Sequence, residues 1–564
     1  MNILFWHGYL LHGSGSNIFT LNVVEEFLKK NNVYLFSQER NWNGIEKIGS
    51  HLVMDENQNL SLEKDFKRQG FVGVTPYIGN LLPVFVYDEY DGFEVKTFDN
   101  LTDKELEKYI DLNVKAMISF LEKNKIDVIY CNHFAISPYI MKKVKEKTGV
   151  PYIVIGHGSS LNYIISRDKR YMELSYDGFL DSQNVVVQSE YIRGRSMEIY
   201  EKKEFFTDPR FKIIPSGVNF EQFNRTMTDE EFKNIIKEKV SFSNGPTKKI
   251  YDGNYEKIKK LGDIREIKKL IDEAEDRIEY RDIDRDLLSK LSEDSRRENK
   301  ILYIGKLIIS KGVQILLMSL PCIFQKNPNT TVSIVGYGKF RPTLELLLRG
   351  LMEANKGLIK VLVKNGGYLE NKKEGSLEYI EYFLENLIKE GKLDEYLKLA
   401  KKINLDNVVF LGKLGHDTLP HIIKKHNLIV VPSIFPESFG MVSIEGMSQG
   451  LIPIVSNHSG LKEIISFKEN LVDLDRNIVE GFEKAINNNL KKLRETPDLK
   501  EKFIEESKKY SFESVAEILL DLKNEKRGIG VSEDTVVIEI DTSTKSNFFR
   551  VESPSEFTLG RFSV

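Results

Sequence analysis

The chain has 564 residues, 41% of them hydrophobic and 29% charged, with a formal net charge of −3 and two cysteines. This length suits two or three domains with cores of their own, and the near balance of charge gives no general attraction to nucleic acid. So few cysteines argue against a disulfide framework. Because no uncharged apolar run reaches the ~18 residues of a membrane span and the first residues show no leader pattern, we expect a cytoplasmic protein.

The first part of the chain alternates between strand-like and helix-like runs up to about residue 220, which predicts a parallel sheet covered by helices. Residues 40–80 are irregular and polar by comparison. The expected strands are 2–6, 33–36, 81–86, 127–130, 151–155, 184–189 and 211–219, and the expected helices are 19–30, 103–123 and 137–147.

Residues 222–298 are rich in charged and poor in large apolar side chains, which predicts an insertion or extended linker with charged helices. Within them, Asp282 and Asp284 resemble an acidic metal motif. A metal–diphosphate site is expected at a strand end rather than inside a charge-dense helical run. We therefore predict no metal site here.

The alternation restarts at residue 300, which predicts a second α/β domain. Residues 355–405 form a second expanded region with helical patterns, and no function is assigned to the tail 527–564. The expected strands are 301–304, 331–335, 407–412, 427–433 and 452–455, and the expected helices are 313–324, 438–449 and 511–523.

Two carboxylates flank the start of the predicted helix 438–449. Glu437 lies in the strand-to-helix loop, and Glu445 lies about two turns into the helix. Between them, the unpaired N–H groups and the dipole of the helix N-terminus form an anion site. A diphosphate bound there would have a carboxylate on either side to bind sugar hydroxyls.

Three further positions carry chemistry at the ends of expected strands. Lys306 and Lys311 follow strand 301–304 and could neutralise one diphosphate. His157 stands between two glycines where α/β sheets bind ligands, either to contact a sugar near a reaction centre or as an ordinary loop histidine. Gly15, in a polar loop after the first strand, either lets the backbone approach a phosphate or punctuates a turn.

These stretches together resemble the retaining nucleotide-sugar glycosyltransferases of family 4, whose GT-B fold has two Rossmann-like domains facing a central cleft. The most specific stretch is Glu437 to Glu445, which has the family's E-x7-E spacing and an internal Ser-Phe-Gly. An isolated E-x7-E is a weak signal, but five further stretches follow the family's order. They are His157-Gly158, Pro215 to Asn219, Gly305 to Gly312, Ile334 to Gly338 and Val409 to Gly412.

The resemblance implies a role for each matched residue. Glu437 would contact hydroxyls of the donor sugar, and Glu445 would hold the ribose. Lys306, where arginine is usual, would balance the leaving diphosphate together with Lys311. The implied catalytic residues are His157, Glu437, Lys306 and Lys311, and the implied donor-binding residues are Gly15, Gly412, Ser438, Phe439, Gly440, Met441, Val442 and Glu445.

The resemblance implies sugar transfer from a nucleoside-diphosphate sugar to a glycan, lipid or small-molecule acceptor, with retention of configuration and without a metal or other cofactor. The alternatives are another GT-B enzyme, such as an α-glucan synthase or a sugar-nucleotide epimerase, and a non-catalytic GT-B module that binds glycans. The Lys-x-Gly-Gly loop of glucan synthases is not found near the amino terminus.

The predicted layout places an acceptor-side domain at 1–221 and a donor-binding domain at 299–510, with a helix at 511–526 packing back on the first domain. The helix 137–147 carries four lysines. Peripheral contact with anionic lipid is therefore kept open beside an ordinary solvated face.

Overall fold

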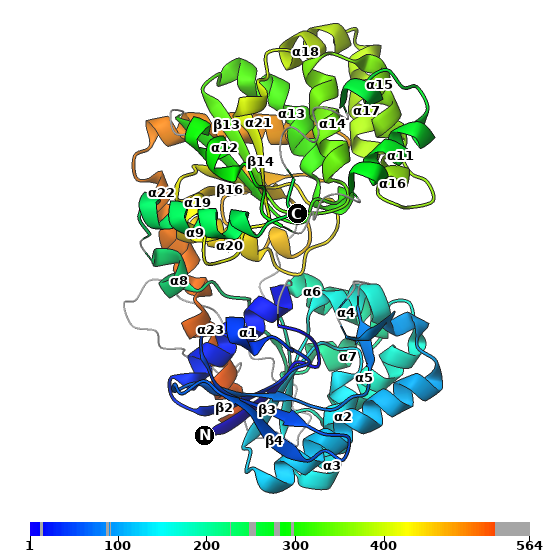
Figure 1. Ribbon diagram of the computed structural model, residues 1–564, viewed down its shortest axis with the longest axis vertical. Helices are drawn as coiled ribbons and strands as arrows, with labels where there is room; N and C mark the ends of the chain where they lie inside the picture. Colours follow the sequence, from blue (N-terminus) through cyan, green and yellow to red (C-terminus); the bar gives the residue numbers. More distant parts are fainter. Residues whose placement is uncertain are drawn as a thin grey trace, which may run out of the picture.

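Two α/β domains make up the molecule. The computed structural model describes residues 1–11, 15–85, 90, 92–225, 227–246, 255–275, 282–294 and 298–524. Figure 1 shows the amino-terminal domain in blue and cyan and the carboxyl-terminal domain in green and yellow. The predicted tail 527–564 lies outside the described residues.

A nine-stranded sheet forms the centre of the amino-terminal domain, in the order β11-β10-β9-β8-β1-β2-β5-β3-β4. The order reverses between β1 and β8, and ligands of open α/β sheets bind beyond the carboxyl ends of the strands at such a point. The strands are β1 (Asn2–Trp6), β2 (Asn32–Phe36), β3 (Ile48–Met54), β4 (Leu60–Asp65), β5 (Phe71–Thr75), β8 (Val128–Asn132), β9 (Tyr152–Ile155), β10 (Asn184–Val187) and β11 (Phe211–Ile213).

Strand β1 is buried on both faces. Ile3 and Phe5 point into one core cluster, and Leu4 and Trp6 point into another, as expected for a parallel strand covered on both sides. The covering helices are α1 (Gly15–Leu28), α2 (Asp103–Lys123), α3 (Ser137–Thr148), α4 (Gly158–Ser160), α5 (Lys169–Asp181), α6 (Glu190–Tyr200) and α7 (Lys203–Thr207), and β6 (Leu81–Val84) pairs with β7 (Glu94–Thr97).

The prediction that residues 40–80 are irregular is wrong, because they form β3, β4 and β5. Strand β4 is largely exposed and lacks an apolar alternation, and it exists because it pairs antiparallel with β3. Gly70 leads into β5, where a Cβ atom would lie 2.2 Å from the Lys47 carbonyl oxygen. Tertiary pairing overrides local propensity here.

The carboxyl-terminal sheet has six parallel strands in the order β14-β13-β12-β15-β16-β17. Its order reverses between β12 and β15. The loops that follow these two strands, 305–312 and 432–440, are the loops that carry the predicted lysines and Glu437. The strands are β12 (Asn299–Ile304), β13 (Thr330–Val335), β14 (Val408–Gly412), β15 (Leu428–Val431), β16 (Ile452–Ser456) and β17 (Leu471–Val472).

Helices surround this second sheet, and residues 355–405 are helical as predicted. The expected helix 313–324 is confirmed as α13. The helices are α13 (Val313–Lys326), α14 (Arg341–Met352), α15 (Lys356–Lys364), α16 (Gly366–Leu369), α17 (Glu378–Lys389), α18 (Leu393–Ala400), α19 (Leu419–Lys424), α20 (Met441–Ser448), α21 (Ile478–Glu495) and α22 (Leu499–Ser507).

The described part of residues 222–298 is folded against the carboxyl-terminal domain. Phe232, Ile267 and Leu287 are buried in the core cluster of that domain, so the alternative of an extended linker is wrong for these residues. The elements involved are α8 (Phe220–Asn224), α9 (Asp229–Ser241), α11 (Ile264–Glu275) and α12 (Leu287–Asp294).

The end of the described chain returns to the amino-terminal domain. Helix α23 (Phe512–Asp521) packs against α1, and the Tyr130 hydroxyl donates to the Leu519 carbonyl at 2.8 Å. Where the chain crosses between the domains, Val218 N–H donates to Tyr510 O at 2.8 Å and Phe512 N–H donates to Val218 O at 3.2 Å. The two chain segments that connect the domains are therefore hydrogen-bonded to each other.

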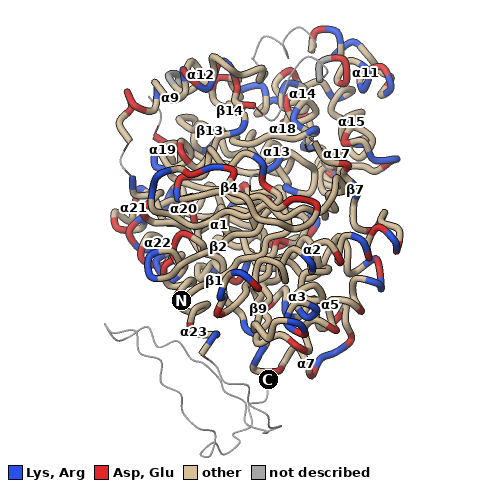
Figure 2. The backbone as a smooth tube through the Cα atoms, turned by 60° about the horizontal axis from the view of Figure 1, so that its bottom comes forward, with Lys and Arg blue, Asp and Glu red and all other residues tan. Residues whose placement is uncertain are grey.

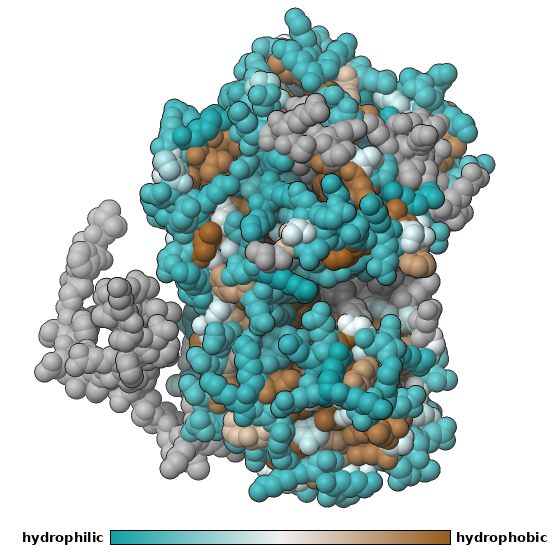
Figure 3. Space-filling view, turned by 60° about the vertical axis from the view of Figure 1, so that its left-hand side comes forward, coloured by the Kyte–Doolittle hydropathy of each residue, from teal (hydrophilic) through white to brown (hydrophobic). Residues whose placement is uncertain are grey.

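The surface mixes both signs of charge, as the interspersed blue and red segments of Figure 2 show. On helix α3, Lys142 and Lys145 form ion pairs with Asp177 and Asp181 of α5, so part of its basic face is neutralised within the domain. Hydrophilic residues cover most of the face in Figure 3. Within the described residues, no helix is long and apolar enough to cross a membrane.

Candidate functional site

Two loops of the carboxyl-terminal domain are held together at its switch point. The N–H groups of Ile434 and Phe435 donate to the Ser310 carbonyl at 2.9 and 3.2 Å. Gly312 has φ +73°, and a Cβ atom there would lie 1.7 Å from the Pro432 carbonyl oxygen. Only glycine permits this conformation and this close approach, which brings Lys311 next to Glu437.

Lys311 and Glu437 form an ion pair in which the lysine Nζ donates to Oε1. The Ser433 hydroxyl donates to the same oxygen at 2.6 Å. Burial alone would raise the pKa of Glu437, but the charge of Lys311 and these hydrogen bonds lower it below its ordinary value. The carboxylate is therefore ionised at neutral pH. The Glu437 side chain is 21% exposed.

The backbone of Glu437 is fixed by residues that sequence reasoning did not select. Its N–H donates to the Ser459 hydroxyl at 2.9 Å, and Gly460 N–H donates to its carbonyl at 3.0 Å. His458 Nε2 donates to the Ser433 carbonyl at 2.7 Å. The segment 458–460 therefore positions both the carboxylate and the serine that binds it.

Helix α20 begins at Met441 rather than at Ser438 as predicted. Gly440 precedes it with φ +110°. This left-handed conformation is not helical, so the helix cannot begin before Met441. Of the five consecutive residues expected at the donor, Met441 and Val442 therefore form the first turn. Phe439 is 5% exposed and its ring packs on Tyr510, so its side chain anchors the loop in the core.

Glu445 is buried on α20 and accepts a hydrogen bond from His416 Nε2 at 3.0 Å. Burial opposes the charged imidazole, but Glu445 outweighs it and raises the pKa of His416 above its ordinary value. The ring of Phe223, on α8, lies 6.0 Å from the imidazole. Sequence reasoning missed His416; its signal was its place in the loop after β14.

Gly412 and Lys306 are the remaining predicted site residues of the carboxyl-terminal domain. Gly412 ends β14 with φ +77°, and a Cβ atom there would lie 2.6 Å from Asp284 N and Oδ1. The packing of residues 282–284 on β14 thus accounts for this glycine. Lys306 directly follows Gly305 at the end of β12 and is exposed, and the Tyr303 hydroxyl donates to its carbonyl at 3.0 Å.

The amino-terminal domain places Gly15 and the His157-Gly158 turn against the start of α20. His157 Nε2 donates to Asn132 Oδ1 at 2.9 Å, and burial, aided by His7, lowers its pKa to about 3. A Cβ atom on the adjacent Gly158 would lie 1.9 Å from Ser438 Oγ, and one on Gly15 would lie 3.6 Å from Met441 Sδ. Both domains therefore meet at the start of α20.

Three hydrogen bonds and one aromatic stack join the two domains near the start of α20. The Ser189 hydroxyl donates to the Ser438 carbonyl at 2.6 Å. Glu463 accepts the N–H groups of Glu190 and Tyr191, each at 2.8 Å, at the start of α6. Tyr163 and Phe435 stack with ring centroids 5.9 Å apart. The amino-terminal turn of α6 is thus capped by a carboxylate from the other domain.

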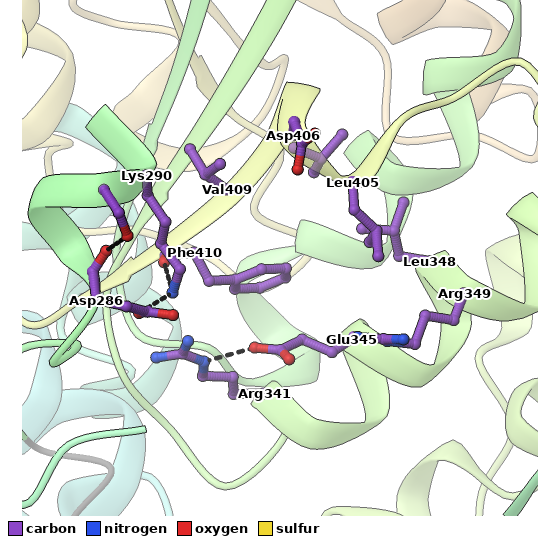
Figure 4. A pocket seen from close by; sticks show the side chains of 12 residues that line it. Asp286, Lys290, Arg341, Glu345, Leu348, Arg349, Leu405, Asp406, Val409 and Phe410 are labelled. Atoms are coloured by element: carbon purple, nitrogen blue, oxygen red, sulfur yellow. Dashed lines mark hydrogen bonds and ion pairs between the residues drawn. The ribbon is translucent and has the colours of Figure 1, made fainter. Parts of the chain in front are cut away.

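The acidic motif lies away from the predicted site. Both oxygens of Asp284 accept hydrogen bonds from Arg341 at 2.6 Å, and Lys290 also donates to one of them at 2.6 Å. Figure 4 shows Lys290, Arg341 and Glu345 at a hollow of about 90 Å³ beside the first half of β14. Asp284 thus ties the 222–298 region to the domain as a buried ion pair.

The sequence is similar to known glycosyltransferases. Residues 384–510 match the family model Glycosyl transferases group 1. An uncharacterized glycosyltransferase of Methanocaldococcus jannaschii is 22% identical over 396 residues, covering 67% of this chain and 73% of that protein. Mannosylfructose-phosphate synthase of Agrobacterium fabrum is 29% identical over 125 residues, covering 22% of this chain and 27% of that protein.

Solved structures extend the likeness to the whole architecture. A glycosyltransferase from Rickettsia africae is 13% identical with a TM-score of 0.51, covering 93% of this chain and 97% of that one. A structure described as trehalose-6-phosphate from E. coli bound with UDP-2-fluoro glucose is 12% identical with a TM-score of 0.51, covering 93% and 99%. The chain therefore has the GT-B fold of glycosyltransferases, with a glycosyl transferases group 1 region in its carboxyl-terminal domain.

Proposed function

We propose that the protein is a retaining glycosyltransferase of family 4 that moves a sugar from a nucleoside-diphosphate sugar to an acceptor hydroxyl. The observation that carries the proposal is the ion pair of Lys311 and Glu437 at the switch point, opposite His157 and Gly158 of the other domain. A site with two lysines, one ionised carboxylate and the first turn of a helix suits a sugar diphosphate.

Each part of the donor has a proposed partner. The diphosphate lies against Lys306, Lys311 and the amides of Met441 and Val442, and Glu437 binds hydroxyls of the sugar. Glu445 binds the ribose hydroxyls through oxygen lone pairs that His416 leaves open, since an ionised carboxylate accepts about four hydrogen bonds. Gly15 lets the backbone come near the diphosphate, and the backbone at Gly412, whose missing Cβ makes room for Asp284, is proposed to face the base.

In the proposed reaction, the acceptor oxygen forms a bond to the anomeric carbon on the face from which the diphosphate leaves. The bond from that carbon to the phosphate oxygen breaks, and the acceptor proton passes to that phosphate oxygen. Lys306 and Lys311 balance the negative charge that develops there. They supply the positive charge that a divalent cation would otherwise bring, so we propose that transfer needs no metal.

The choice of donor and the location of the protein remain proposals. The E. coli structure with a TM-score of 0.51 holds UDP-2-fluoro glucose, so UDP-sugars are the first donors to test. A cytoplasmic location and peripheral membrane contact stay predictions from the sequence.

Thermal-shift screening with UDP, GDP, ADP, dTDP and their sugars tests the proposal, because a ligand that binds only the native state raises the melting temperature. We expect one nucleotide series to stabilise the protein, and Lys311→Ala and Glu437→Ala each to lower donor turnover at least about 100-fold. Lys326→Ala, which removes an exposed ion pair on α13, is the control. Turnover at the wild-type rate in both variants would overturn the assignment, and nucleotide binding without any turnover would indicate a non-catalytic module.

A further inference from the structure

A small hollow lies at the switch point of the amino-terminal sheet, beyond the carboxyl ends of β1 and β8. Aromatic rings form most of its wall, among them Trp6, Tyr9, Phe85 and Phe98. Its cavity volume is about 20 Å³, which is room for one water molecule or one hydroxyl group rather than a whole sugar ring.

The described lining of the hollow carries no formal charge. None of the described residues that line it is Asp, Glu, Lys or Arg. Of its two histidines, His7 has its pKa lowered to about 4, chiefly by burial, and burial also lowers the pKa of His133 well below its ordinary value. Both imidazoles are therefore neutral at physiological pH.

Two side chains at the hollow have polar atoms without a partner. His133 is 4% exposed, and neither of its ring nitrogens has a hydrogen-bond partner among the described residues. Trp6 is also 4% exposed, and within the same part of the chain its Nε1 has none. Buried polar groups are nearly always paired, and an exception calls for an explanation.

The backbone holds His133 in an unusual conformation. Its φ is +70°, which non-glycine residues seldom adopt and which tends to occur at functional sites. Its N–H donates to the Ile155 carbonyl at 2.8 Å, its carbonyl accepts the Ser137 hydroxyl, and the ring lies 4.4 Å from that of Phe85. The imidazole is thus fixed in place, with both nitrogens buried and without a hydrogen-bond partner among the described residues.

The unpaired atoms specify the chemistry of a ligand group. A neutral imidazole offers one donor and one acceptor, and an indole offers one donor. A hydroxyl can both accept from Trp6 and exchange hydrogen bonds with His133. A phosphate or carboxylate would bring an unpaired charge into an apolar, uncharged space, and an ammonium group could not accept from the indole.

The hollow also lies next to the proposed donor site. The ring of His133 is 4.8 Å from that of His157. Gly158, which follows His157, contacts Ser438 of the loop 432–440. We propose that Trp6, Phe85 and His133 form a hydroxyl socket that binds one uncharged hydroxyl group of the acceptor, so that no phosphate or carboxylate group of the acceptor enters it. This inference rests on the proposed function.

Tryptophan fluorescence can report on the socket directly. The chain has two tryptophans, and the second, Trp42, is buried elsewhere with its Nε1 donating to Thr75 Oγ1 at 3.2 Å. Trp42→Phe therefore leaves Trp6 as the one fluorophore. We expect glucose, mannose or inositol, with the stabilising nucleotide present, to change its emission saturably. Inorganic phosphate and acetate, which offer only charged groups, should leave the emission unchanged, and a saturable response to either anion would overturn the proposal.

Two substitutions test the socket in the transfer reaction. Trp6→Phe removes the indole donor, and His133→Asn keeps a residue type that tolerates positive φ but withdraws the imidazole nitrogens. Trp6 and His133 are buried, so the loss of packed atoms should lower the melting temperature of both variants, as it should in the equally buried Trp42→Phe control. The KM for a neutral sugar acceptor should rise at least tenfold, nucleotide affinity should stay within about twofold, and Trp42→Phe should leave the acceptor KM unchanged.

An acceptor KM unchanged in both variants, together with silent Trp6 fluorescence, would mean that the hollow holds only a water molecule and would overturn the proposal. Failure of the proposed function looks different, since the wild-type protein would then bind no nucleotide and transfer no sugar. The fluorescence titration needs no turnover, so it decides about the socket in that case as well.

Discussion

The imidazole of His416 donates a hydrogen bond of 3.0 Å to the Glu445 carboxylate, joining the loop after β14 to helix α20. Glu445 is 5% exposed, so covering it with a ligand would bury a bare carboxylate if the imidazole were absent. Paired burial of a charge costs much less than unpaired burial. His416 is therefore a positioning residue for Glu445.

His416→Ala should weaken binding of the stabilising nucleoside diphosphate about tenfold, because a charge-assisted hydrogen bond of this kind is worth about 1.5 kcal/mol. His416→Gln should lose less, since its amide can still donate. In wild type the 2′-deoxy nucleotide should bind more weakly than the ribonucleotide, and this gap should shrink in His416→Ala. Isothermal titration measures all of these affinities.

The control for this prediction is His421→Gln. His421 pairs with Asp229 and lies on the ring of Phe232, so it resembles His416 without contacting Glu445. An equal loss for ribo- and deoxynucleotides in His416→Ala would show that the histidine does not act through the carboxylate.

Glu437 predicts a pH dependence of stability. Its pKa is lowered from the ordinary value of 4.5 in spite of burial, through Lys311 and Ser433. Its contribution to the free energy of unfolding is therefore complete above pH 4.5 and is lost as the pH falls through the lowered pKa. The melting-temperature difference between wild type and Glu437→Gln should be largest near pH 7 and shrink below pH 4.5. Glu501→Gln, at an exposed position, should show no such trend.

Gly312→Ala should lower the free energy of unfolding by at least about 2 kcal/mol and abolish nucleotide binding, because both the positive φ and the Pro432 carbonyl exclude a Cβ atom. Gly194→Ala is the matched control, since its Cβ atom would meet nothing within 4 Å in helix α6. That variant should gain about 0.5–1 kcal/mol. Chemical denaturation measures both, and an unaffected Gly312→Ala protein would contradict the packing of the two loops.

Glu463→Ala should loosen the two domains by uncapping α6. Nucleotide affinity should change less than twofold because all proposed nucleotide contacts except Gly15 lie in the carboxyl-terminal domain, whereas donor turnover should fall because His157 comes from the other one. Small-angle scattering should show a larger radius of gyration for the variant. Glu469→Ala, which breaks an exposed ion pair within one domain, is the control. An equal radius of gyration for all three proteins would show that Glu463 does not hold the domains together.

Asp284→Asn should cost about 3 kcal/mol of stability, because it leaves Arg341 buried with a weaker partner. The loss should be the same with EDTA and with Mg²⁺, since the carboxylate serves an ion pair. Donor turnover of the wild-type protein should also survive EDTA. Activity that is lost with EDTA and restored by Mg²⁺ or Mn²⁺ would contradict metal-independent transfer.

Local chemistry explains which elements could be predicted from the sequence. Helix α2 runs from Asp103 to Lys123 as expected, because Thr102 and Glu105 form a capping box at its start. Strand β4 was missed because pairing with β3, not its own pattern, makes it a strand. Helix α20 starts late because the conformation of Gly440 depends on the loop around it.

The site likewise contains residues that the sequence predicted and residues that only the fold brings together. The E-x7-E spacing located Glu437 and Glu445, but it says nothing of their partners, since Lys311 and His416 reach them from other loops of the fold. His133 carried no signal in the sequence beyond its place at a strand end. Its unpaired nitrogens become visible only when β1, β8 and the ring of Phe85 surround it.

Helix α23 has a consequence for biosynthesis. Its residues Phe512, Val515 and Leu519 belong to the same core cluster as Phe5 and Phe27 of the first domain. During translation, the amino-terminal domain cannot complete that core until nearly the whole of the second domain has left the ribosome. When the first domain folds before the next is made, its core therefore lacks the side chains of α23 until that helix has been synthesised.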